Sequence, residues 1–69
     1  MALVIEYVNL LELSKVKNAL ETIEDLRKIT PVEVVSIETE ENTVKLTLKV
    51  PNKHVNLAKE KFPNAVVVA

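Results

Sequence analysis

The side chains with the most chemical potential in this chain are one histidine, two serines and two pairs of adjacent acids. His54 is the only histidine and the chain has no cysteine, so no second ligand of either type is present to complete a zinc site. Ser14 and Ser36 are explained by helix capping and by the solvent side of a strand, which leaves no nucleophile–base pair. The side chains of Glu24 and Asp25 are expected to diverge on a helix, and Glu40-Glu41 borders a turn, so neither pair predicts paired-carboxylate catalysis. These residues predict no enzyme activity and no metal or cofactor site.

Lysines gathered in the C-terminal part are the next candidates. Residues 43–69 hold five lysines and one acid, whereas residues 1–42 hold four basic residues and nine acids. Lys45, Lys49 and Lys53 would form a side able to bind RNA or another anionic ligand. However, the net charge of the whole chain is −1, and the strands lack the aromatic residues that stack on bases. Nucleic-acid binding is therefore the less favoured alternative.

Composition indicates one small domain over residues 1–69. Hydrophobic residues make up 48% of the chain, which is enough for a compact core and argues against disorder. A core of this size rarely supplies more than ~3–5 kcal/mol, and no disulfide can add to it because cysteine is absent. We therefore expect association with a second copy to support the fold. Because no apolar run approaches the ~20 residues of a membrane span and no secretory signal is visible, we expect a cytoplasmic protein.

The chain contains no glycine, although roughly five are expected from average usage. Glycine ordinarily occupies helix C-caps and hairpin turns where the backbone takes φ > 0, and asparagine is its usual substitute. Asn9, Asn42, Asn52 and Asn64 all lie at expected junctions between elements. This composition fits two origins, namely an engineered scaffold or a small protein from a heat-adapted organism.

Hydrophobic periodicity predicts the element order βαββαβ. An alternating pattern over residues 2–8 comes first, and the helical pattern that follows ends at Thr30, where Pro31 disfavours α geometry. Asn9 and Ser14 compete as the N-cap of this helix, and Ser14 is favoured because it lies nearer the periodic stretch. The remaining expected elements are strands over 32–40 and 43–50, a helix over 53–62 capped by Asn52, and a strand over 65–69.

The two central strands form the clearest local prediction, which is a hairpin. A two-residue turn at Glu41-Asn42 brings apolar residues together on one face and polar residues of complementary charge on the other. The expected pairs are Thr39–Val44, Ile37–Leu46 and Val35–Leu48 on the apolar face, and Glu38–Lys45 and Ser36–Thr47 on the polar face. Asn42 is expected to take the φ > 0 position of the turn.

This element order resembles the ferredoxin-like, or split βαβ, superfold over the whole chain. The resemblance implies an α+β two-layer sandwich with an antiparallel sheet in the order 4-1-3-2 and both helices on one face. Heavy-metal-associated domains have this shape, but they place Cys-x-x-Cys where this chain has Asn9-Leu-Leu-Glu12, and ACT-type domains place glycine there. RNA-recognition motifs are similar around Tyr7-Val-Asn-Leu10, but their third strand carries aromatic residues that residues 43–50 lack.

Strand alternation assigns side chains to the two faces of the expected sheet. The residues expected in the core are Leu3, Ile5, Val16, Leu20, Ile23, Val35, Ile37, Leu46, Leu48, Val55, Phe62 and Val66. The outer face is then expected to expose Val4, Val8, Val34 and Val67 around Glu6, Lys45 and Lys49. The last strand forms a sheet edge without the charge or proline that usually protects one.

These features favour a non-enzymatic, heat-stable structural module whose biochemistry is folding and self-association, most simply as a two-fold dimer. The expected interface contains Val4, Val8, Val34, Val67, Ala65 and Ala69. The alternative is an RNA- or anionic-ligand-binding domain that uses Lys45, Lys49 and Lys53. Salt-dependent retention on a nucleic-acid matrix would distinguish the two.

Overall fold

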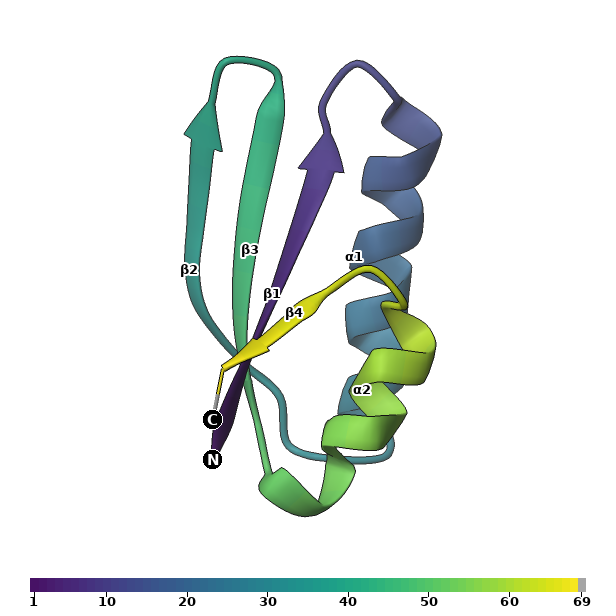
Figure 1. Cartoon of the computed structure of the whole chain (residues 1–69). Coiled ribbons are helices and arrows are strands. Elements are labelled where there is room, and N and C mark those ends of the chain that lie inside the picture. Colours follow the sequence, from purple (N-terminus) through teal and green to yellow (C-terminus); the bar gives the residue numbers. More distant parts are fainter. Residues whose placement is uncertain (69) are drawn as a thin grey trace.

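The computed structural model describes residues 1–68 as a four-stranded antiparallel sheet with two helices on one face (Figure 1). Its elements are β1 (Ala2–Asn9), α1 (Leu13–Arg27), β2 (Glu33–Glu40), β3 (Thr43–Val50), the 3₁₀ turn η1 (Asn52–His54), α2 (Val55–Lys61) and β4 (Val66–Val68). The strand order β2-β3-β1-β4 is the predicted order read from the opposite edge. The α+β class and the strand order are therefore confirmed, and the arrangement is compatible with ferredoxin-like topology.

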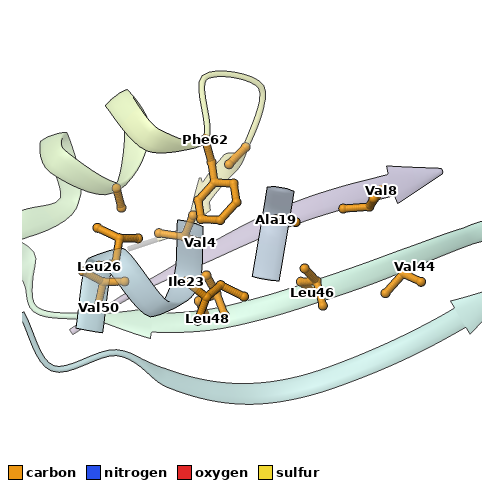
Figure 2. Close-up of a cluster of buried hydrophobic side chains, with 12 residues drawn as sticks. Val4, Val8, Ala19, Ile23, Leu26, Val44, Leu46, Leu48, Val50 and Phe62 are labelled. Atoms are coloured by element: carbon orange, nitrogen blue, oxygen red, sulfur yellow. The ribbon is translucent and has the colours of Figure 1, made fainter. Parts of the chain in front are cut away.

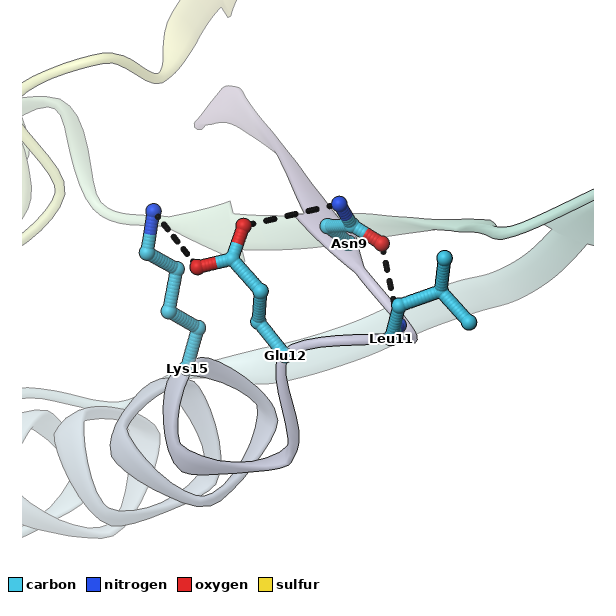
Figure 3. Close-up of polar contacts among 4 residues, drawn as sticks. All are labelled: Asn9, Leu11, Glu12 and Lys15. Atoms are coloured by element: carbon cyan, nitrogen blue, oxygen red, sulfur yellow. Dashed lines mark hydrogen bonds and ion pairs between the residues drawn. The ribbon is translucent and has the colours of Figure 1, made fainter.

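The connection before α1 is organised by Asn9 and not by a side-chain N-cap. α1 begins two residues earlier than predicted, so that Ser14 lies inside the first turn and Glu12 takes the N-cap position. The Asn9 Oδ1 accepts a hydrogen bond from the Leu11 N–H at 2.9 Å, and Asn9 Nδ2 donates to Glu12 Oε1 at 3.5 Å. Glu12 also pairs with Lys15 at 3.2 Å (Figure 3). The polar motif therefore fixes the turn that leads into the helix.

β2 and β3 pair in the predicted register over most of their length. The pairs Thr39–Val44, Glu38–Lys45, Ile37–Leu46 and Ser36–Thr47 are confirmed. The register then shifts between Val34 and Ser36, so that Val34 and not Val35 lies opposite Leu48. One extra residue in a strand produces this irregularity, and it leaves Val35 50% exposed. The assignment of Val35 to the core is therefore wrong.

The hairpin turn contains the only positive φ among residues 1–68, and it belongs to Glu41 (53°) and not to Asn42. Left-handed geometry costs a residue with a Cβ roughly 1–2 kcal/mol.

We expect Glu41→Gly to raise the free energy of unfolding by up to about 1 kcal/mol, and Glu41→Val to lower it. Thermal unfolding of both variants, with Asn42→Gly as the control, measures this. Stabilisation by Asn42→Gly with no gain from Glu41→Gly would contradict the assignment.

β1 presents to the helices the face that was predicted to point outward. Val4 and Val8 are 0% and 7% exposed, so the prediction that they lie on the outer face is wrong. Their partners in β3 are Leu48 and Val44, which belong to the core, and directly paired residues of antiparallel strands lie on the same face. Because β1 carries apolar side chains on both faces, its own alternation does not choose between them.

The hydrophobic core lies between the sheet and the helices (Figure 2). Its buried members are Val4, Val8, Ala19, Ile23, Leu26, Val44, Leu46, Leu48, Val50, Ala58, Phe62 and Ala65. Among the residues predicted for the core, Ile23, Leu46, Leu48 and Phe62 are confirmed as buried, and Val16 is half-buried against the core. Leu3, Ile5 and Val55 are half-buried outside this cluster. Leu3 and Ile5 alternate with the buried Val4 and so lie on the face away from the helices, which means that their assignment to the core is wrong. Leu20, Val35, Ile37 and Val66 are exposed, so their assignment to the core is wrong.

A buried polar contact joins the end of the first helix to the start of the second. Thr30 is 2% exposed, and its hydroxyl lies 2.7 Å from Nδ1 of His54. The predicted helix over 53–62 is divided here into η1 and α2, and Pro51 takes the N-cap position predicted for Asn52. His54 therefore has a structural partner in the loop between α1 and β2.

We expect His54→Ala to lower the free energy of unfolding by about 1–3 kcal/mol, because it leaves the buried Thr30 hydroxyl without its partner. Adding Thr30→Val should recover part of this loss, since valine removes the unpaired hydroxyl at nearly the same volume. Denaturant titration of the two variants and the parent measures the effect. Equal stability of His54→Ala and the parent would show that the contact contributes nothing.

Candidate functional site

The sheet face that points away from the helices carries a continuous apolar surface over β1 and β4. Alternation from the buried Val4 and Val8 places their neighbours on this face. We call five of these residues the outer band: Leu3, Ile5, Tyr7, Val66 and Val68. Strand pairing sets Leu3 beside Val68 and Ile5 beside Val66, and the two β4 valines are 52% and 45% exposed. Adjoining exposed apolar side chains of this kind are typical of interaction surfaces.

β4 is also an edge of the sheet. Its three residues are all valine, with no charge and no proline, whereas the opposite edge, β2, carries Glu33, Glu38 and Glu40. Charged residues discourage pairing of an edge with another chain, whereas this three-residue edge strand carries none and leaves its outward backbone N–H and C=O groups available for pairing. The free edge and the outer band adjoin and therefore form one surface.

The residues predicted for the interface do not themselves lie on this surface. Val4, Val8 and Ala65 are buried, Val34 and Val67 are half-buried against the core, and Ala69 lies outside the described residues. The physical reason is the pairing of Val67 with Val4, which places both on the helix side of the sheet. The neighbouring residues of each strand take the outward positions instead.

The predicted anion site is divided by the pairing of β2 with β3. Lys45 lies opposite Glu38 and Lys49 lies opposite Glu33, and both lysines are half-buried. Lys53 is exposed in η1, which follows the end of β3. A glutamate beside each sheet lysine lowers the positive potential that an anionic ligand would meet. Anion binding by these lysines stays a prediction.

A polar cleft lies between the end of β1 and the two helices. It is lined by Glu6, Tyr7, Val8, Asn9, Lys15, Asn18, Ala19, Lys61, Phe62 and Asn64. Glu6 lies on the helix side of β1, opposite the core residue Leu46. Burial raises the pKa of the Glu6 carboxyl above its ordinary value of 4.5, against the opposing effects of a hydrogen bond from the Tyr7 N–H and the charge of Lys59.

Because the pKa of Glu6 is raised, the folded state binds this proton more tightly than the unfolded chain does. The free energy of unfolding should therefore fall as pH rises from the unfolded pKa through the folded pKa. Glu6→Gln cannot ionise, so we expect it to be more stable than the parent at neutral pH and to lose this advantage near about pH 4. Thermal unfolding as a function of pH checks this, and parallel profiles for the two proteins would contradict it.

Among residues 1–68 no three side chains of the His, Cys, Asp and Glu types gather into a metal site. Within the same range no helix is long and apolar enough to cross a membrane. Comparison of the chain with protein-family models, curated proteins and solved structures finds no match.

Proposed function

We propose that this protein is a non-enzymatic interaction module that self-associates as a two-fold dimer through the outer band and the free edge of β4. The observation that supports this most strongly is the contiguity of an apolar sheet face with an edge strand that carries no charge and no proline. Covering half-exposed apolar side chains is favourable, and a core of this size benefits from such support. An isologous two-fold contact is the commonest closed arrangement for a homo-oligomer.

Val66 is the best position at which to test the proposal, because it is 52% exposed on the outer band and does not belong to the core. Val66→Lys places a charge in the interface, so we expect it to raise the dimer Kd at least about tenfold while the monomer stays folded. Ile29→Lys is a matched control, since Ile29 is 56% exposed but lies in the loop after α1. Sedimentation velocity over a concentration series measures both. An equal loss of association in the two variants would overturn the assignment of the surface.

One observation favours a second function, the binding of RNA or another anionic ligand. Tyr7 lies opposite Lys45 in the pairing of β1 with β3, so an aromatic ring and a cation are neighbours on the outer face. Rings on a sheet face can stack on bases, and lysines can contact phosphates. If this function operates, retention on immobilised single-stranded RNA should fall with salt and should be lost in Tyr7→Ala. If Tyr7→Ala leaves the retention unchanged, the retention comes from non-specific charge attraction and not from stacking on Tyr7.

A further inference from the structure

α1 does not cover the full width of the sheet, and an apolar groove remains between α1 and β2. Figure 1 shows β2 at the edge of the sheet remote from α1. Two adjoining hollows form the groove and share Leu20, Ile37 and Leu46. The residues lining the first hollow are all apolar, and Leu20 and Ile37 are 53% and 61% exposed. Both had been expected in the core, so the groove is a place where the chain leaves part of its own apolar face uncovered.

Leu20, Glu24 and Arg27 line the groove from α1, and they belong to a stripe that continues along this helix beyond the groove. Leu13, Lys17, Leu20, Glu24 and Arg27 recur at intervals of four and three residues, so they share one face of the helix. Leu20 lies at the centre, with a cation one turn before it and an anion one turn after it. A two-fold axis through Leu20 would therefore bring Lys17 of each copy onto Glu24 of the other. The three central residues, Lys17, Leu20 and Glu24, are therefore complementary to themselves when the helix is reversed end to end, whereas Leu13 would face Arg27.

Lys17 and Glu24 are available for contacts across such an axis. Their side chains are 77% and 70% exposed, and their present partners are Glu21 at 3.9 Å and Arg27 at 3.6 Å on the same helix. Exposed pairs of this kind contribute little to stability, so exchanging them for pairs with another copy costs little. Opposite charges that flank an apolar centre set the orientation and register of an interface.

We infer that the groove between α1 and β2 is an interface for a second copy of this chain, formed by antiparallel packing of two α1 helices about a two-fold axis near Leu20. Leu20 and Ile37 of one copy cover the same residues of the other, and Lys17 pairs with Glu24 on each side of the axis. This surface lies on the helix side of the sheet, so the inference does not rest on the outer band. A protomer that uses both surfaces forms assemblies larger than a dimer.

The test measures association in the Val66→Lys background, where the outer band is blocked. Sedimentation velocity should still detect a dimer, and Lys17→Glu should raise its Kd at least about tenfold by setting like charges together. Adding Glu24→Lys should return the Kd to within about threefold of the background, since the reversed charges pair again. Glu21→Lys is the matched control, because it removes the same intrahelical pair with Lys17 but lies off the stripe.

The possible outcomes separate this inference from the proposed function. If the parent dimerises but Val66→Lys is monomeric at every concentration, the groove interface is overturned. The outer band would then be supported as the interface. The opposite result is that Val66→Lys associates as strongly as the parent, that adding Lys17→Glu dissociates it, and that Glu24→Lys restores association. This result would support the groove interface and overturn the outer band. Equal Kd values for Lys17→Glu, the rescued double variant and Glu21→Lys would show that the helices do not pair through this stripe.

Discussion

Replacing Val4 with lysine is expected to unfold the protein. Val4 is 0% exposed in a central strand, and an unpaired ammonium group in the core costs several kcal/mol. That cost is comparable to the ~3–5 kcal/mol that a core of this size supplies, so no cooperative melting transition should remain near room temperature. Circular dichroism as a function of temperature measures the loss.

Tyr7→Lys is the control for this experiment, because Tyr7 belongs to the same strand and is 55% exposed on the opposite face. It should keep a cooperative transition within a few degrees of the parent. A stable Val4→Lys variant together with an unfolded Tyr7→Lys variant would reverse the assignment of the two faces of β1. The outer band would then lose its basis.

Leu48→Ala is expected to lower the free energy of unfolding by about 2–5 kcal/mol. Leu48 is 0% exposed and lies opposite both Val4 of β1 and Val34 of β2, so a cavity there is surrounded by three strands. Denaturant titration gives the difference from the parent. For a domain of this size, the variant should be close to unfolded in the absence of denaturant.

Val35→Ala distinguishes the observed register of β2 and β3, which shifts between Val34 and Ser36, from the predicted register without a shift. In a hairpin without a shift Val35 would lie opposite Leu48 and would share its burial, whereas here it is 50% exposed beside the irregularity. The variant should therefore stay within about 1 kcal/mol of the parent. A loss as large as that of Leu48→Ala would place Val35 in the core and contradict the shift.

The hairpin and the strand order were predictable because the alternation within each strand and the pairing between the strands indicate the same register. β3 alternates strictly between apolar and polar residues, and its partner places Ile37 opposite Leu46 and Glu38 opposite Lys45 in one register. β1 gives no such signal, because apolar residues occupy both of its faces and Glu6 interrupts the one that is buried. Its orientation depends on pairing with β3, which is a long-range contact that local alternation cannot supply.

The absence of glycine has a different explanation from the one predicted. Asparagines were expected to take the left-handed positions, yet within residues 1–68 Glu41 alone has a positive φ. The first helix closes with Lys28 in right-handed geometry, whose N–H donates to the Asp25 carbonyl. The chain therefore adopts turns that scarcely require φ > 0, and does not need a glycine substitute at each junction.

The two candidate surfaces could be predicted only in part. The unprotected last strand is visible in its composition, but its outward side chains are Val66 and Val68, because Val67 pairs with the buried Val4. Leu20 and Ile37 satisfy the helical and strand patterns for burial, and they remain exposed because α1 lies over other strands of the sheet. The lateral position of a helix on a sheet is a packing outcome that periodicity does not encode.

The measurement that tests self-association most directly is sedimentation velocity of the parent protein from low to high micromolar concentration. We expect an average mass that rises with concentration from the 7.7 kDa monomer to the dimer or beyond. Val66→Lys should shift this rise to higher concentration, whereas Ile29→Lys should not. A parent that remains a 7.7 kDa species over the whole range would contradict self-association.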